Sequence, residues 1–435
     1  MSDSIYARPK GVHLSDEEMS RVMGAESGAM RSPIPTQIIS NGEYNPPPQT
    51  PKQKQVEGLI NEYADKYGRK MGMDRRKFLT TTCGMAAAFL AMNKVYGPVF
   101  DVTEAEAADR EMSDERAKLL SKQFIFDDQT HFVRDDFDKE GLLGLGDYAS
   151  KNWNPAMIDE KKGGVPLTLA RYKFQNYMKE IFLDSDTKVA LLSGAPFDDP
   201  SWWLLSNDQI AGARAAVNKI SGSRRLFSHF VFTPNYPNWV EEVDRAVAEL
   251  KPDGWKGYTV GDPLSPSQKG TQWRLDDEKL MYPVYEKMQK SGINNICLHK
   301  GLLPKDYEKS WKEVWQYNTP WDLAKAAKDW PGLNFIIYHT ALRPFTEQPD
   351  TELAEFEKSG YIQWSTDVAK LVSEQGLKNI YGEIGTSFAN SAVANPRFAA
   401  AFVGQLVNLM GADNVVWGTD SVWYGSPQWQ IEAMR

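Results

Sequence analysis

From about residue 123 onward the sequence repeats one pattern: a short run of Val, Ile, Phe and Tyr, a polar loop, then apolar residues spaced i, i+3, i+4. The short runs predict eight strands, over residues 123–127, 188–192, 226–233, 254–259, 294–299, 334–339, 379–383 and 414–420. Helical spacing lies between them, over residues 167–182, 208–220, 240–250, 276–290, 320–329, 367–375 and 396–410. Alternating strands and helices form parallel sheets, and eight such units have the size of a closed barrel. We therefore predict an α/β fold, a (β/α)8 TIM barrel over residues 123–435.

The main alternative is an open, doubly wound sheet, but no Gly-rich phosphate loop follows an early strand. The end of the sequence raises a separate point. Only residues 421–435 follow the eighth predicted strand, which is short for a loop plus a covering helix. We therefore expect a barrel that lacks its last helix, with the seam between the strands near Phe124 and Val416 partly exposed.

The N-terminal quarter has a different composition, because the first of the 14 Trp is Trp153. Residues 1–74 are rich in Pro and polar side chains and contain no Phe or Trp, which predicts a disordered leader. Residues 75–107 then begin with Arg75 and Arg76, continue with an apolar stretch and end in an Ala-Glu-Ala triplet.

Paired arginines, a weakly apolar segment and an A-x-A site are typical of a twin-arginine export signal. The apolar stretch from Phe78 to Met92 is too short for a membrane span, which needs about 20 residues, and it carries three Thr. Because signals normally begin a chain, either the leader is long or translation starts at Met71 or Met73. Cleavage after Ala107 would leave a periplasmic or exported protein without a stable membrane anchor.

Charge and cysteine content exclude other classes of protein. The net charge of −8 argues against a protein that holds nucleic-acid phosphates. Cys83 and Cys297 are the only cysteines, and the CxxC spacing of structural zinc sites is absent. Any metal would therefore be held by His and carboxylate side chains.

Four polar residues lie at or just beyond predicted strand ends: His131, His299, His339 and Asp420. In a (β/α)8 barrel the carboxyl ends of all strands meet at one mouth, where active sites lie. Imidazoles with a carboxylate are suitable ligands for a divalent metal that keeps one position open for water. Such a metal lowers the pKa of its water to near 7, and a neighbouring carboxylate can take the proton.

These residues resemble the amidohydrolase superfamily, in the amidohydrolase-related branch that contains metal-dependent hydrolases and non-oxidative decarboxylases. The resemblance runs from about Phe124 to the end, through DDQTH (127–131), CLHKGL (297–302), YHTALRP (338–344) and VVWGTDSVWYG (415–425). It implies that His131, His299 and Asp420 bind a divalent metal, with zinc as the first expectation. It also implies that Asp420 is the general base and that His339 polarises the substrate or transfers a proton.

One position departs from that family's pattern, because Gln129 stands where the first His of a His-x-His pair is expected. An amide oxygen is a weaker ligand than an imidazole nitrogen. Three interpretations follow: three strong ligands plus the Gln129 oxygen, a metal other than zinc, or a barrel that has lost its metal.

Other residues have both a functional and a structural interpretation. Glu383, Lys256 and Arg343 are candidates for substrate binding, Arg343 as a carboxylate clamp. Glu383 could equally orient a ligand, and Lys256 could be paired internally. Lys300 should point away from His299 by strand alternation, and His229 is expected in the core or behind the ligands.

Three long loops, over residues 134–165, 261–274 and 301–318, are expected to close the barrel mouth. They carry Trp153, Trp273, Trp311 and Trp315, which indicates either an apolar or aromatic substrate or loops packed onto the rim.

We therefore predict an exported, metal-dependent hydrolase of a small organic substrate. A decarboxylase using the same residues and a degenerate barrel acting as a binding protein remain alternatives. The sequence leaves the oligomeric state open, with a homo-oligomer as one expectation.

Overall fold

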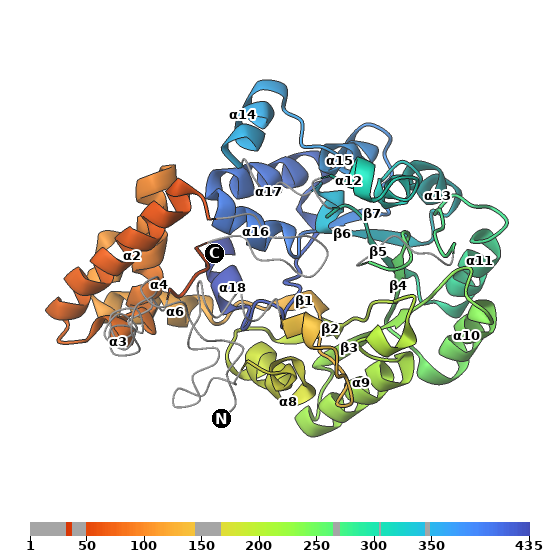
Figure 1. Ribbon diagram of the computed structural model, residues 1–435, viewed down its shortest axis with the longest axis horizontal. Coiled ribbons are helices and arrows are strands. Elements are labelled where there is room, and N and C mark those ends of the chain that lie inside the picture. Colours follow the sequence, from red (N-terminus) through yellow and green to blue (C-terminus); the bar gives the residue numbers. More distant parts are fainter. Residues whose placement is uncertain (1–31, 37–48, 144–166, 264–269, 304–305, 344–348) are drawn as a thin grey trace, which may run out of the picture.

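The computed structural model describes residues 32–36, 49–143, 167–263, 270–303, 306–343 and 349–435 (Figure 1). At its centre eight parallel strands follow one another in chain order, as predicted. The strands are β1 Phe126–Thr130, β2 Val189–Leu192, β3 Leu226–Val231, β4 Gly254–Tyr258, β5 Asn295–His299, β6 Asn334–Tyr338, β7 Ile380–Glu383 and β8 Val415–Val416. The predicted first strand lies about three residues early, and the predicted eighth is too long.

The sheet closes through the chain that follows β8. Asp128 N–H donates to the Trp417 carbonyl (3.0 Å), Asp420 N–H to the Gln129 carbonyl (2.9 Å) and His131 N–H to the Ser421 carbonyl (2.6 Å). β1 is therefore paired on both edges, and the fold is a (β/α)8 barrel. This closure brings Gln129 and His131 beside Asp420.

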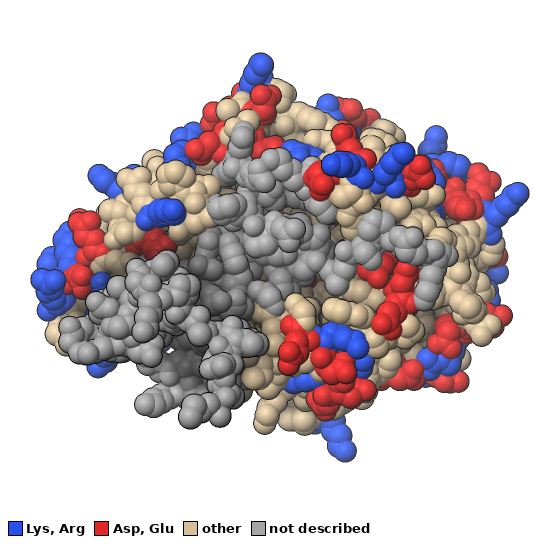
Figure 2. All heavy atoms as spheres, in the orientation of Figure 1, with Lys and Arg blue, Asp and Glu red and all other residues tan. Residues whose placement is uncertain are grey.

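Helices alternate with the strands around the outside of the barrel (Figure 1). They are α8 Phe174–Met178, α9 Asn207–Ser221, α10 Trp239–Arg245, α11 Tyr282–Ser291, α12 Tyr307–Ser310, α13 Leu323–Asp329, α14 Pro349–Ser359, α15 Ser365–Ser373, α16 Ser387–Ala394 and α17 Pro396–Met410. Local sequence sets their ends: Ser206 forms a capping box at the start of α9, and Gly222, with φ of 65°, ends it. Acidic and basic side chains are mixed over their outer surfaces (Figure 2).

The expected loss of the last helix is wrong, because a short helix, α18 Gln428–Met434, follows β8. It is held by Arg435, whose guanidinium donates to the Leu120 carbonyl (2.8 Å) and pairs with Asp186 (2.9 Å). A mostly apolar groove of about 340 Å³ remains beside α18, along the β1–β8 seam. Phe124, one of the residues that line it, is 70% exposed, so part of this seam is open to solvent although α18 is present.

The N-terminal segment differs most from the sequence expectation. The structure contains α2 Pro51–Lys70, α3 Arg75–Leu79, α4 Thr82–Tyr96, α5 Glu104–Ala108 and α6 Arg110–Leu120. Residues 51–70, expected in a disordered leader, form a helix because Thr50 and Gln53 make a capping box and Val56, Ile60 and Ala64 are buried on one face. The rest of the expected leader lies mostly outside the described residues.

These helices pack against the barrel near α16 and α17 (Figure 1). Gln53 Nε2 donates to the Val393 carbonyl (3.2 Å) and the Tyr96 hydroxyl to the Ala394 carbonyl (3.1 Å), both in buried contacts. Cys83 and Ala87 on α4 are fully buried. Within the described residues, no helix is both long enough and apolar enough to cross a membrane.

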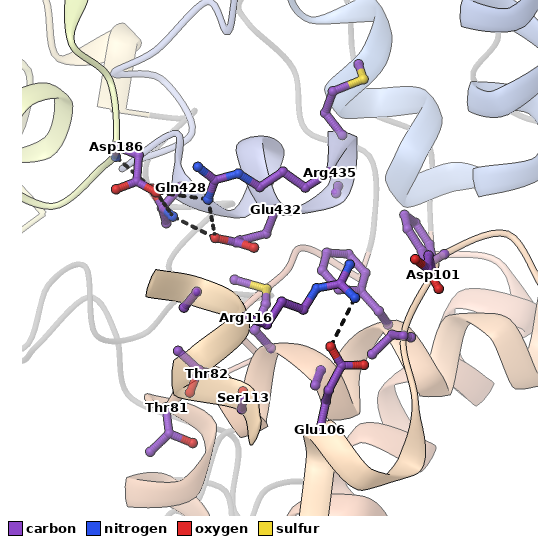
Figure 3. A pocket seen from close by; sticks show the side chains of 18 of the residues that line it. Thr81, Thr82, Asp101, Glu106, Ser113, Arg116, Asp186, Gln428, Glu432 and Arg435 are labelled. Carbon is purple, nitrogen blue, oxygen red and sulfur yellow. Dashed lines mark hydrogen bonds and ion pairs between the residues drawn. The ribbon is translucent and has the colours of Figure 1, made fainter. Parts of the chain in front are cut away.

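A cavity of about 600 Å³ lies where this helical layer meets α18 (Figure 3). Its walls include Phe89 and Met85 of α4, and the Glu106–Arg116 ion pair (3.0 Å) lies on one side of it.

Candidate active site

The predicted polar side chains meet at the carboxyl-terminal mouth of the barrel. His131 directly follows β1, His299 ends β5, His339 directly follows β6 and Glu383 ends β7. Asp420 lies in the segment after β8 that pairs with the end of β1. All five side chains are at least 97% buried.

His131 and Asp420 form the first close pair. His131 Nε2 lies 3.1 Å from Asp420 Oδ1, and His131 Nδ1 lies 3.1 Å from the Ser193 carbonyl oxygen. Because a carbonyl only accepts, Nδ1 carries the proton. Nε2 then faces a second acceptor, so this contact requires either a second ring proton or a cation between the two atoms. The ring also stacks on Trp423, with centroids 5.6 Å apart.

His299 and His339 form the second pair, with Nδ1 of His299 3.1 Å from Nε2 of His339. His339 Nδ1 lies 2.9 Å from the Gly385 carbonyl oxygen, which fixes its proton on Nδ1 and leaves a lone pair on Nε2. The His299 ring stacks on Tyr258, with centroids 4.9 Å apart. Each imidazole is thus held by an aromatic ring or a backbone carbonyl.

Burial and neighbouring charges set the protonation states. Burial lowers the pKa of His339 to about 4, although Asp420 partly opposes this, and burial with nearby His339 lowers the pKa of His299 well below its usual value. Burial alone would raise the pKa of Asp420, but His131, His339 and the Thr386 hydroxyl together hold it below its usual range. At neutral pH the site therefore combines neutral imidazoles at His299 and His339 with an ionised carboxylate at Asp420.

Gln129 and Glu383 lie together beside two glycines. The Gln129 side-chain oxygen is buried and has no hydrogen-bond partner among the described residues. A Cβ on Gly385 would lie 2.7 Å from that oxygen and 2.4 Å from Glu383 Oε1, and one on Gly418 would also collide with Glu383. A side chain at either position would therefore force Glu383, and at Gly385 also Gln129, to move from its present place.

Glu383 also holds the backbone of the β6 end. Its carboxylate accepts from His339 N–H (3.0 Å) and Gly385 N–H, and its carbonyl accepts from the Thr340 hydroxyl (2.8 Å). Burial raises its pKa well above the usual value. Glu383 therefore positions His339 in the structure, one of the two roles expected for it.

The backbone near these residues is unusual. His339, Thr340 and Ala341 have φ of 63°, 44° and 52°, and Asp420 and Thr386 have φ of 58° and 54°. Such left-handed conformations are costly for residues other than glycine and are concentrated at functional sites.

Lys256 lies one layer deeper in the barrel. It is fully buried on β4, with Nζ 3.4 Å from the centre of the Tyr338 ring. The Tyr338 hydroxyl donates to the Asp128 carbonyl (2.6 Å). Burial raises the pKa of Asp128 to about 8, and the charge of Lys256 opposes this rise.

The other candidates lie away from this cluster. Arg343 donates to Glu352 (2.6 Å) on α14, so its guanidinium is engaged there. Lys300 points away from His299 as expected and pairs with Asp322 (2.9 Å). Trp273 and Trp311 are buried against the barrel, whereas Trp153 lies outside the described residues.

Two residues at this site were not predicted from the sequence: Ser193, which bonds His131 through its carbonyl, and Thr386, whose hydroxyl donates to Asp420 Oδ2 (2.5 Å). Ser193 lies just after the end of β2, and Thr386 lies just after the end of β7.

The donor set fits a divalent cation in its chemistry. His131 Nε2 faces the acceptor Asp420 Oδ1, the lone pair of His339 Nε2 is directed at His299 Nδ1, and the Gln129 oxygen is buried without a hydrogen-bond partner among the described residues. In the structure, however, these ligand atoms lie against one another in pairs: His131 against Asp420, and His299 against His339. Across the described part of the chain, no group of three or more His, Cys, Asp or Glu side chains has an arrangement that could hold a metal ion.

The fold and the site define a (β/α)8 barrel with buried imidazoles and carboxylates at its mouth. Residues 206–432, about half of the sequence, match the amidohydrolase family model. The chain therefore belongs to the amidohydrolase family, as the motifs around His299, His339 and Asp420 indicate. None of the curated proteins matches this sequence.

Three solved structures illustrate the similarity. A TIM-barrel protein from Bordetella bronchiseptica is 14% identical, with 72% of this chain and 94% of that chain covered and a TM-score of 0.47. The 5-carboxyvanillate decarboxylase of Sphingomonas paucimobilis is 12% identical, with 72% and 92% covered and a TM-score of 0.39. A dihydroxybenzoic acid decarboxylase of Polaromonas, with bound manganese, is 14% identical, with 69% and 87% covered and a TM-score of 0.40.

Proposed function

We propose that this protein is a metal-dependent hydrolase of a small organic substrate. The observation that carries the proposal is the contact of His131 Nε2 with Asp420 Oδ1, two acceptors that need a cation or a proton between them. His131, His299, Asp420 and the Gln129 oxygen would hold the metal. When bound, a divalent ion supplies Lewis acidity and lowers the pKa of water.

The protein residues have separate tasks in this proposal. Asp420 is ionised and Thr386 holds its Oδ2, so its carboxylate is oriented to take the proton from an attacking water. His339 has its proton on Nδ1 and a lone pair on Nε2, so it acts as a proton acceptor rather than a stabiliser of negative charge. Glu383 keeps His339 in place through the backbone.

Elemental analysis tests the metal centre directly. Protein purified without chelator is expected to contain about one divalent ion per chain, zinc or manganese, and to lose it in His131→Ala and Asp420→Ala variants. Gln129→His should raise the affinity, because an imidazole replaces a weak amide ligand. If the wild type and Gln129→His both contain no metal, the proposal fails.

Decarboxylation on the same residues is the second candidate reaction: it would use the same metal site, and a protonated Asp420 or His339 would deliver the proton to the carbon that carbon dioxide leaves. Product analysis in ¹⁸O-labelled water separates the two reactions. Hydrolysis incorporates the label, whereas carbon dioxide release without incorporation would reject hydrolysis.

A binding protein built on a degenerate barrel is the third candidate. Two observations favour this candidate: the ligand atoms face one another in pairs, and Gln129 stands in place of an imidazole. In that case the wild type would contain no metal, and ligands would bind equally well with and without chelator.

We also propose export through the twin-arginine pathway. The exposed Arg76 at the start of α3, next to Arg75, supports it. Ala107 at the expected cleavage site is buried in α5, which packs against α4 and α6, so cleavage there requires α5 to separate from these helices. N-terminal sequencing of the protein from the periplasm tests both points: a start at Ala108 supports cleavage, and absence from the periplasm rejects export.

A further inference from the structure

A chain of buried polar groups connects the barrel interior to His131. His229, on β3, is 2% exposed, and its ring lies between Cys297 and Ser193. Its Nε2 lies 3.2 Å from the Cys297 sulfur and its Nδ1 3.0 Å from the Ser193 hydroxyl oxygen. The Ser193 carbonyl oxygen in turn lies 3.1 Å from His131 Nδ1.

Ser193 is the central link of this chain. It directly follows β2 and is completely buried. Its N–H donates to the Thr130 carbonyl (2.9 Å), and its side chain contacts His229. Ser193, whose carbonyl accepts from His131, is therefore held on two sides: β1 holds its N–H and His229 holds its hydroxyl.

The orientation of His131 depends on that carbonyl. A proton on Nδ1 leaves Nε2 as the atom that faces Asp420. A rotated Ser193 peptide would remove the acceptor and allow the other tautomer, in which Nε2 no longer offers a lone pair. Partners behind a metal-ligating imidazole generally affect metal affinity by 10- to 100-fold.

We propose that His229 is a positioning residue for the site: it fixes Ser193, whose carbonyl sets the tautomer and the ring orientation of His131. The inference rests on the proposed metal centre, but it concerns a contact that is present without metal. Burial and Lys256 lower the pKa of His229 well below its usual value, so its ring is neutral in this role.

Asn and Leu at position 229 form a matched pair of variants. Both side chains have four heavy atoms and branch at Cγ, so they share a shape and differ in polarity, although Leu is the bulkier of the two. Only the Asn amide reaches the position of Nδ1 and keeps the contact with the Ser193 hydroxyl. A third variant, Ser193→Ala, removes the hydroxyl and leaves the carbonyl.

The first measurement is the affinity for Mn²⁺ or Zn²⁺, by chelator competition on apo-protein whose folding is checked by circular dichroism. We expect His229→Leu and Ser193→Ala to weaken binding about 10- to 100-fold and the double variant to be no weaker. His229→Asn should stay within about threefold of the wild type. Equal losses in the Asn and Leu variants, or no loss in Leu, would overturn the inference.

The second measurement works without metal. The chain has only five His, so ¹⁵N-histidine labelling gives few ring signals to assign. The wild type and His229→Asn should show the Nδ1 of His131 fully protonated, and His229→Leu should show a mixture of states in which Nδ1 is only partly protonated. If the wild type binds no metal, the proposed function fails, while this tautomer still decides the role of His229.

Discussion

The barrel and the N-terminal helices are both folded and both bury apolar side chains, yet only the barrel is evident from the sequence. Barrel strands carry Val, Ile, Phe and Tyr in short runs, and each run is followed by a helix with a regular apolar face. α4 is instead rich in Ala and Met, and it packs against α2, which is nearby in the chain, and against α16, which is far away in the chain. A weakly apolar segment with small side chains is therefore ambiguous: it fits a signal and also a close-packed helix.

Deleting residues 1–107 is the strongest test of whether the N-terminal helices are part of the fold, as the barrel is. If the helices are part of the fold, the barrel loses the cover over α16 and α18, and each large apolar side chain uncovered costs about 1.5–3 kcal/mol. We expect residues 108–435 alone to be insoluble or to melt at least about 10 °C below the full chain. Equal melting temperatures in differential scanning calorimetry would instead show that the helices are a removable leader.

Within the barrel, the buried ion pair of Lys300 and Asp322 should contribute more to the free energy of unfolding than an exposed ion pair does. Lys300 is completely buried and donates to Asp322 and to the Tyr317 carbonyl (2.7 Å). Lys300→Met leaves Asp322 buried without its cation and should cost about 3–5 kcal/mol in urea unfolding.

The control for that variant is Lys325→Met, since Lys325 is 48% exposed and pairs with Asp329 on the surface. It should cost less than about 1 kcal/mol. Similar losses in both variants would contradict the prediction.

The closure between β1 and the chain after β8 should weaken as pH rises. Asp127 accepts from Thr419 N–H (2.9 Å), and burial raises its pKa to about 7. Between about pH 4 and pH 7 the unfolded chain has released this proton and the folded chain retains it, so stability falls by about 1.4 kcal/mol per pH unit from this group. Asp127→Asn should reduce the slope of unfolding free energy against pH by that amount; an unchanged slope would refute the assignment.

Alanine substitutions at two glycines test how closely individual positions of the N-terminal helices are packed. A Cβ on Gly84 of α4 would lie 2.5 Å from the Phe78 carbonyl oxygen, so Gly84→Ala should destabilise by about 1–3 kcal/mol. Gly58 of α2 has nothing within 4 Å of such a Cβ, and Gly58→Ala should stabilise by about 0.5–1 kcal/mol. Thermal melts of both variants check the signs, and a neutral Gly84→Ala would mean that α4 is loosely packed.

The sequence predicts most of the fold and the main residues of the site for one physical reason. Strand ends are visible in the sequence, and parallel strands bring their ends together, so His131, His299, His339 and Asp420 could be placed at one mouth. Ser193 and Thr386 could not be identified, because a backbone carbonyl and a hydroxyl have no distinctive pattern. The true extent of β8 was also hidden, since backbone pairing with β1 rather than apolar character forms that edge.

The two buried thiols allow the opening rates of the two regions to be compared. Cys83 lies in the N-terminal helices and Cys297 in the barrel, and both are almost completely inaccessible. A thiol reagent can reach either one only when its surroundings open, so the two labelling rates report how often each region opens under native conditions. Mass spectrometry of the labelled peptides would show whether the helices detach from an intact barrel or the two regions open as one unit.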